Sequence, residues 1–265
     1  METSKAKPLL EVQNLGIRFG GLKAVSDFNI DIHRGELMGL IGPNGAGKTT
    51  IFNILTGVYA PTEGQIIFNG EKISGLAPYK VTRKGISRTF QNIRLFKELS
   101  VLDNVKIAYH TLAKNSIFSS VFRLPSHFKN EKEMEEKATE FLKIFGLDHL
   151  KDEKAKNLPY GGQRRLEIAR ALAADPKLLL LDEPAAGMNP QETKDLMELI
   201  AFIRKKFNLT ILLIEHDMKL VMGICERIFV VDHGQLIAHG SPEEIRTHPK
   251  VIEAYLGEEV GENHA

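Results

Sequence analysis

Several residue types and patterns are scarce in this chain, and each scarcity excludes a class of protein. The sequence has no tryptophan and one cysteine, Cys225, so an internal disulfide framework is excluded and a reducing compartment is indicated. No run reaches the roughly 18 apolar residues of a membrane-spanning helix, and the start, residues 1–8, is polar rather than signal-like. We therefore expect a protein that is not inserted in a membrane by its own sequence and can reach one through partners.

Net charge is also almost absent. With 35 Lys and Arg against 34 Asp and Glu, the formal net charge is +1, which gives no basis for a nucleic-acid-binding surface or for broad attraction to anionic membranes. The 265 residues suffice for one large domain or two small ones, and a hydrophobic fraction of 43% with a charged fraction of 26% is typical of a globular protein. No internal repeat or low-complexity linker divides the chain.

What the chain does contain is a glycine-rich segment between two apolar runs, residues 37–41 and 51–55. Its residues are Gly42, Pro43, Asn44, Gly45, Ala46, Gly47, Lys48, Thr49 and Thr50. A strand, a glycine turn and then a helix are the context in which this G-x-x-x-x-G-K-[ST] pattern indicates a phosphate-binding loop rather than a turn without a ligand. Glycines allow positive φ, so successive N–H groups can point at phosphate oxygens, and the helix N-terminus adds its own. Lys48 would then contact the β- and γ-phosphates, and the Thr49 hydroxyl would bind Mg²⁺.

Two acidic residues follow the wholly apolar run 178–181. Such a strand is typical of a parallel sheet, where both faces are buried, and its carboxyl end lies where open α/β sheets bind ligands. Adjacent side chains of an extended chain point to opposite sides, so the two acids are suited to different roles. We expect Asp182 to hold Mg²⁺, directly or through water, and Glu183 to polarise an attacking water. For a lone Asp-Glu pair the alternative is a helix cap or a turn.

Three other side chains are candidates because of where they stand. His216 follows the apolar run 210–214, so we expect it at the same sheet edge as the acids, as a hydrogen-bond donor to a γ-phosphate rather than a metal ligand. Phe19 precedes a Gly-Gly turn, and both a core position and an exposed platform for adenine are open. Gln91 would be an ordinary surface amide without the pattern around it.

Hydrophobic periodicity and turn residues predict the other elements. Strands are expected at residues 9–12, 29–32, 64–70, 178–181 and 210–214, and a closing hairpin at residues 227–231 and 235–239 around His233 and Gly234. Helices are expected at residues 101–109, 131–145 (ended by Gly146), 164–174, 191–206 and after the N-cap Ser241 with Pro242. Residues 110–130 have no clean period and are interpreted as a loop or a broken pair of short helices.

The combination of these motifs resembles the ATPase subunits of ABC transporters. The glycine loop, Gln91, residues 160–163, residues 182–183 and His216 match that family's Walker A, Q-loop, signature, Walker B and H-loop in order, and the resemblance covers about residues 8–257. More narrowly, residues 95–105, 183–190 and 248–257, with an insertion at 110–130, look like the branched-chain amino-acid importer ATPases (the LivG type).

The resemblance implies an α/β fold. It consists of a P-loop NTPase (RecA-like) core with a mostly parallel sheet, an N-terminal antiparallel β subdomain and an α-helical subdomain. On this interpretation residues 1–265 form a single ABC ATPase domain, with the nucleotide-binding core at 8–90 and 161–240, the helical subdomain at 91–160 and a C-terminal helical tail at 241–265.

The resemblance also implies ATP and Mg²⁺ as cofactors and assigns roles to the motif residues. Phe19 would stack on adenine, and the loop residues 42–50 would hold the phosphates. Mg²⁺ would be bound by Thr49, Gln91 and, through water, Asp182. The catalytic residues would be Glu183, which acts on water, His216, which contacts the γ-phosphate, and Gln91.

The implied partners are a second ATPase subunit (identical or a sister chain), two transmembrane permeases and, indirectly, a periplasmic or extracellular substrate-binding protein. In such a pair the subunits close head to tail, so that each ATP lies between one subunit's Walker A loop and the other's signature segment. The helical part, about residues 91–160, would dock onto the permeases. Nucleic acid is not an expected partner, and the location would be the cytoplasmic face of the inner or plasma membrane.

Two positions depart from the usual family pattern. The signature segment comprises Pro159, Tyr160, Gly161, Gly162 and Gln163. If the following helix keeps the usual register, Pro159 replaces the signature serine, whereas a slide by one residue puts Tyr160 there. Of these residues, Gly161 is the one to which the family's signature role transfers in either register. Asn189 stands where an aspartate is usual, as it commonly does in the branched-chain group.

Two other functions compete with branched-chain amino-acid import. One is the closely similar lipopolysaccharide-export type of ABC ATPase. The insertion at residues 110–130 favours the importer over this type. The other is a DNA-repair or translation ATPase that transports nothing. The near-neutral charge and the lack of a second cassette or a coiled-coil arm in the sequence disfavour it.

Overall fold

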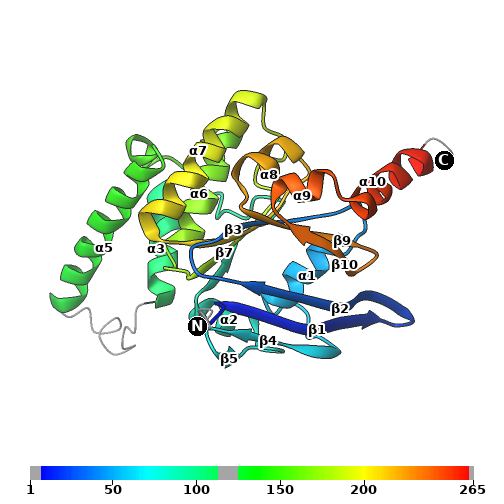
Figure 1. Ribbon diagram of the computed structural model, residues 1–265. Coiled ribbons are helices and arrows are strands. Elements are labelled where there is room, and N and C mark those ends of the chain that lie inside the picture. The colour runs from blue at the N-terminus through cyan, green and yellow to red at the C-terminus, as the bar shows by residue number, and fades with distance from the viewer. Residues whose placement is uncertain (1–6, 113–124, 263–265) are drawn as a thin grey trace, which may run out of the picture.

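The computed structural model describes residues 7–112 and 125–262, which form two sheets with helices packed around the larger one (Figure 1). The smaller sheet is antiparallel, in the order β2-β1-β4-β5. Its strands are β1 (Leu10–Phe19), β2 (Leu22–Ile32), β4 (Glu63–Phe68) and β5 (Glu71–Lys72). The predicted short strands 9–12 and 29–32 are thus parts of two long strands. Their register shifts between Val12 and Leu15 and again before Ile17, and these irregularities break the alternation on which the prediction relied.

The larger sheet has six strands in the order β10-β9-β3-β8-β7-β6. They are β3 (Leu37–Ile41), β6 (Ile86–Arg88), β7 (Leu178–Asp182), β8 (Thr210–Ile214), β9 (Arg227–Asp232) and β10 (Gln235–Gly240). Neighbouring strands are parallel except β9 and β10, the predicted closing hairpin. The α/β fold with a mostly parallel sheet and a separate antiparallel N-terminal sheet is therefore confirmed.

The four leucines of β7 show why its sequence is wholly apolar. Leu179 and Leu181 pack in one hydrophobic core, with the helices, and Leu178 and Leu180 pack in another, with the smaller sheet. All four side chains are fully buried. A strand with cores on both faces has no position left for a polar side chain until it ends.

The helices lie on both sides of this sheet (Figure 1). They are α1 (Lys48–Leu55), α2 (Pro78–Lys84), α3 (Val101–Leu112), α5 (Pro125–Ile144), α6 (Tyr160–Leu172), α7 (Pro190–Phe207), α8 (Met218–Ile224), α9 (Pro242–Arg246) and α10 (Pro249–Glu262), with short 3₁₀ turns at Asp148–Leu150 and Ala155–Asn157. α3 and α5 pack against each other and against α6, on the side away from the antiparallel sheet. Over residues 7–112 and 125–262, no helix has both the length and the apolar content needed to cross a bilayer.

Two helix starts differ from the prediction. The helix expected at 131–145 begins earlier, at Pro125, a residue type that is favoured at the first position of a helix. Residues 110–130, interpreted as a loop or a broken pair of short helices, are helical at both ends, and residues 113–124 lie outside the described part. The helix expected at 164–174 begins at Tyr160, with Pro159 as its N-cap, although two glycines weaken its first turn.

The strand ends bring the predicted motifs to one edge of the sheet. Leu40 of β3 pairs with Ile214 of β8, and Ile214 pairs with Asp182 of β7. Since neighbouring strands lie about 5 Å apart, the segments that follow these three strands begin side by side. The glycine loop, residues 182–183 and His216 each belong to one of them.

Candidate functional site

The glycine loop has the conformation that its sequence predicts. Gly42, Gly45 and Gly47 all have positive φ, and Gly47 precedes the first turn of α1. Of these three glycines, Gly42 lies closest to a neighbouring backbone, because a Cβ atom there would lie 1.9 Å from the carbonyl oxygen of Val231. Glycine is therefore required at Gly42 by both backbone angle and space.

Lys48 is folded into this loop. Its Nζ donates to the carbonyl oxygens of Gly42, at 2.6 Å, and Pro43, at 2.8 Å, and the residue is buried. The ammonium thus adds its charge to the N-terminal end of α1, where the helix dipole already favours an anion. Thr49, the next residue, is exposed.

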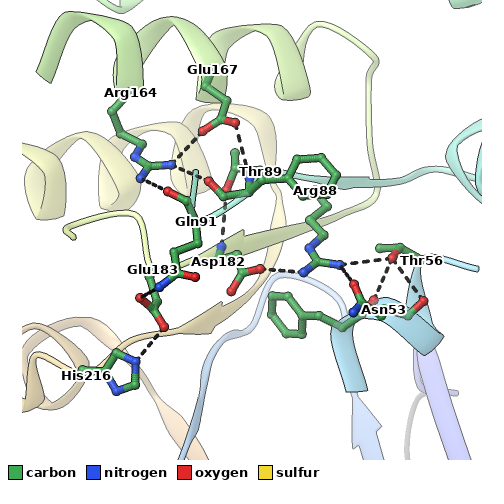
Figure 2. Close-up of polar contacts among 12 residues, drawn as sticks. Asn53, Thr56, Arg88, Thr89, Gln91, Arg164, Glu167, Asp182, Glu183 and His216 are labelled. Atoms are coloured by element: carbon green, nitrogen blue, oxygen red, sulfur yellow. Dashed lines mark hydrogen bonds and ion pairs between the residues drawn. The ribbon is translucent and has the colours of Figure 1, made fainter. Parts of the chain in front are cut away.

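Glu183 stands between the two other predicted side chains (Figure 2). Its Oε1 lies 2.6 Å from Nε2 of His216, and its Oε2 accepts a hydrogen bond of 2.6 Å from Nε2 of Gln91. These residues come from the segments after β7, β8 and β6, so the sheet edge gathers groups that are far apart in sequence. The arrangement fixes both carboxylate oxygens in place.

The reason that we gave for separating the two acids is wrong. Asp182 is the last residue of β7, but Glu183 has a φ of 45°, so it does not continue the alternation of an extended chain. Its N–H donates to the carbonyl oxygen of Ile214 at 2.9 Å, which ties the turn to β8. A left-handed backbone is costly for glutamate and is held by such contacts.

Asp182 is buried and paired with Arg88, which the sequence analysis missed (Figure 2). Nη2 of Arg88 lies 2.6 Å from Oδ2 of Asp182, and Nη1 donates to Oδ1 of Asn53 on α1 at 2.7 Å. The guanidinium also lies over the rings of Phe52 and Phe90, at 5.5 and 5.0 Å from their centroids. The only signal in the sequence is a charged residue at the end of a short strand.

Glu215 is a second missed carboxylate. It is buried and accepts hydrogen bonds from the N–H groups of Ala185, at 2.7 Å, and His216, at 3.1 Å. Burial raises the pKa of Glu215, against the opposing effect of these backbone donors. Its contacts hold the turn after β7 against the end of β8.

The oxygen donors named for Mg²⁺ fit that ion chemically. Thr49 offers a hydroxyl, Gln91 an amide and Asp182 a buried carboxylate, and Mg²⁺ prefers such hard oxygens while keeping waters and phosphate oxygens in its shell. Across the part of the chain that the structure describes, no group of three or more His, Cys, Asp or Glu gathers as a metal site. A site with few carboxylates suits an ion that arrives with a phosphate.

Phe19 is not a core residue. It is 43% exposed at the end of β1 and makes an edge-to-face contact with Tyr59, whose ring centroid lies 5.2 Å away. The exposed interpretation therefore agrees with its position, and the core alternative is wrong. Tyr59 was not predicted and gives the ring a fixed support.

The signature segment forms the first turn of α6. The phenol of Tyr160 donates to the carbonyl oxygen of Ala186 at 2.9 Å, and the amide of Gln163 turns back to donate to Leu158 at 2.9 Å. Asn189, the other departure, caps α7 and forms a capping box with Glu192. Its presence thus has a structural reason of its own.

Comparison with protein families and with curated proteins gives consistent matches. A family model described as "ABC transporter" matches residues 25–186, and one described as "Branched-chain amino acid ATP-binding cassette transporter" matches residues 235–261. The chain is 51% identical to the high-affinity branched-chain amino acid transport ATP-binding protein LivG of Escherichia coli (strain K12), over 96% of this chain and 99% of that protein. It is 37% identical to the lipopolysaccharide export system ATP-binding protein LptB of the same strain, over 94% and 98%.

Solved structures agree with this match. The ADP conformation of MJ1267, an ATP-binding cassette of an ABC transporter, superposes with a TM-score of 0.82 at 34% identity and covers 95% of this chain and 100% of that one. The dimeric post-hydrolysis state of the cassette MJ0796, bound to ADP and Pi, gives a TM-score of 0.74 at 25% identity over 88% and 98%.

Proposed function

Since this chain belongs to the ABC transporter family, as an ATP-binding subunit of the branched-chain amino-acid (LivG) group, we propose that it drives the import of branched-chain or related amino acids through partner permeases. It is an ATPase of that family. The observation that carries the site assignment is the carboxylate of Glu183, held at 2.6 Å by both Gln91 and His216 at the sheet edge where the glycine loop begins.

The glycine loop binds the triphosphate in this proposal. Residues 42–50 offer backbone N–H groups, Lys48 supplies a charge close to them, and the aromatic face of Phe19 receives adenine. Phosphoryl transfer needs positioning and charge stabilisation more than covalent chemistry, and these are the properties that the loop has.

Mg²⁺, when bound, neutralises charge on the β- and γ-phosphates. Thr49, Gln91 and Asp182 would hold it, the last through water, because Arg88 already occupies one carboxylate oxygen of Asp182. The same ion pair keeps that carboxylate in one orientation.

Glu183 acts on water as the general base in this proposal. Its two oxygens are oriented by neighbours on different strands, so the carboxylate is positioned before a substrate arrives. His216 lies beside Glu183 with its side chain 47% exposed, and we assign to it the contact with the γ-phosphate. Gln91 links the water-activating group with the metal.

A second ATPase subunit completes the site. Among the described residues, the hydrogen bonds of Tyr160 and Gln163 in the signature segment, residues 159–163, go to Ala186 and Leu158 rather than to the glycine loop, and the MJ0796 cassette is dimeric. We propose that Gly161 and its neighbours approach the ATP of the opposed subunit. Such a site makes hydrolysis conditional on closure.

The permeases dock on a cavity of about 650 Å³ between the core and the helical part. Its charged and aromatic lining residues are Arg88, Phe90, Arg94, Phe96 and Arg170. Arg88 is already paired with Asp182, so the charges that favour an acidic segment of the partner are those of Arg94 and Arg170. On this view residues 91–160 form the helical subdomain, 8–90 and 161–240 the nucleotide-binding core and 241–265 a C-terminal tail, on the cytoplasmic face of the membrane.

The proposal is tested by transport. The chain is co-expressed with its genomic neighbours, and labelled leucine uptake into proteoliposomes that carry an external binding protein is measured. We expect uptake that needs internal MgATP and is lost with Glu183→Gln. Co-purification with lipopolysaccharide-export permeases instead, with no leucine uptake, would contradict it.

A further inference from the structure

A fully buried ion pair lies on α6, outside the residues assigned above. Nη1 of Arg164 is 2.7 Å from Oε2 of Glu167, one helical turn later, and their side chains are 0% and 1% exposed. Burying two charges costs more than their attraction returns unless their other donors and acceptors are also satisfied. The partners that satisfy them therefore matter.

Those partners are main-chain groups of the loop after β6, residues 89–94 (Figure 2). Arg164 donates to the carbonyl oxygens of Phe90, at 2.7 Å, and Gln91, at 2.8 Å. Glu167 accepts from the N–H groups of Phe90, at 3.4 Å, and Arg94, at 3.1 Å. We call Arg164 and Glu167 the α6 clamp, because they hold this loop by its backbone.

The α6 clamp binds the backbone of Gln91, whose side chain contacts Glu183, the proposed general base. Gln91 is bound by its carbonyl oxygen to Arg164 and by its amide nitrogen to Glu183. At the other side of Arg164, Nη2 lies 3.3 Å from the phenol of Tyr160, which donates to Ala186, three residues after Glu183. The first turn of α6 is thus joined to both segments that flank the carboxylate.

We propose that Arg164 and Glu167 are positioning residues. Through them, the placement of the Gln91 side chain against Glu183 depends on the position of the signature segment. The inference rests on the proposed function, in which the signature segment meets the ATP of the opposed subunit. When that contact moves the start of α6, the clamp moves residues 89–94 with it. Each subunit's catalytic geometry then responds to the nucleotide in the other site.

The first test is kinetic, on the ATPase assembled with its permeases. Glu167→Gln keeps the side-chain volume and removes the charge, and Arg164→Lys keeps the charge and removes the two-pronged donor. We expect each to lower kcat on the order of tenfold with little change in KM, because a small misplacement of a catalytic group is costly. Arg165→Gln is the matched control, since Arg165 is 39% exposed and lies 3.7 Å from exposed Asp195.

A double-mutant cycle with Gln91→Ala shows whether the clamp acts through that residue. With Gln91 removed, Glu167→Gln should cost little more. An equal loss in both backgrounds would overturn the inference, because the pair would then act independently of Gln91. The thermal midpoint of each variant is compared with that of Arg165→Gln to separate positioning from unfolding.

Amide hydrogen exchange tests the clamp without any assumption about catalysis. In Glu167→Gln, protection of the Phe90 and Arg94 amides should fall several-fold, while the amides of β3 stay protected. Unchanged exchange at both amides would overturn the clamp itself. Wild-type turnover in Gln91→Ala would instead overturn the role that the proposed function gives to Gln91.

Discussion

The glycine loop, residues 42–50, and the signature segment, residues 159–163, are both glycine-containing segments that lead into a helix, yet their glycines do different things. In the loop, a Cβ atom at Gly42 would come within 1.9 Å of a backbone oxygen, and the φ of this residue is positive. In the signature segment, Gly161 and Gly162 are helical, and a Cβ atom would meet side chains only at 3.3 and 3.5 Å. The first set of glycines is needed to fold one chain, whereas the fold places no such demand on the second, whose surface we propose meets another subunit.

The largest expected effect falls on the sheet edge beside the loop. Glu183→Gln should leave ATP binding intact and lower turnover roughly 10²–10⁴-fold, because a general base is lost while the loop is untouched. A closed dimer should accumulate with ATP, which size-exclusion chromatography detects. Turnover equal to that of the wild type would remove Glu183 from the mechanism.

Lys48→Ala should act on binding rather than on the chemical step. Loss of a charge-assisted contact to the phosphates is expected to weaken nucleotide affinity roughly 10- to 100-fold. Titration with a fluorescent ATP analogue measures it. Lys72→Ala, on the exposed strand β5, is the control. Nucleotide affinity that is the same in Lys48→Ala as in this control would argue against the loop as the phosphate site.

Gly42→Ala tests the requirement for glycine in the loop. The left-handed backbone and the contact with Val231 should cost roughly 2 kcal/mol or more of stability and abolish nucleotide binding. Thermal unfolding without MgATP measures the loss of stability, and the shift on adding MgATP measures nucleotide binding. A variant as stable as the wild type would mean that the loop has another conformation in solution.

Gly161→Ala tests the opposite expectation for the signature segment. In the single chain the methyl group would meet only the end of the Glu192 side chain, 3.3 Å from Oε1, which must shift slightly. The thermal midpoint should therefore change by less than about 2 °C, and ATP should still bind. Turnover of the assembled transporter should fall on the order of tenfold, because a donor surface for the opposed phosphate is displaced. Equal turnover in Gly161→Ala and in the wild type would contradict the proposal that this surface meets a second subunit.

Tyr160→Phe should have the smallest effect on turnover. It removes the hydrogen bond to Ala186 and the contact with Arg164, which corresponds to about 1 kcal/mol at a partly exposed site. The thermal midpoint falls by a few degrees and turnover falls modestly. If turnover instead fell as far as with Glu183→Gln, the phenol would have a direct role at the nucleotide.

The comparison also explains what the sequence could predict. β3, β7 and β8 and the glycine loop are encoded in short consecutive runs, so their positions follow from local pattern, and with them the common edge of residues 182–183 and His216. Arg88, Arg164 and Glu167 were missed because no local pattern marks them. The contacts that tie them to the site, from Arg88 to Asp182 and from Arg164 and Glu167 to the loop 89–94, span 73 to 94 residues. The left-handed turn at Glu183 and the start of α6 at Tyr160 depend on tertiary contacts in the same way.

The alternating leucines of β7 have a consequence for how this chain can vary in length. Inserting or deleting one residue in the strand would exchange the side chains between its two cores and displace both acids from the loop. A one-residue change in the length of β7 is therefore expected to abolish folding, and the packing of both cores fixes the separation of Leu181 from Glu183.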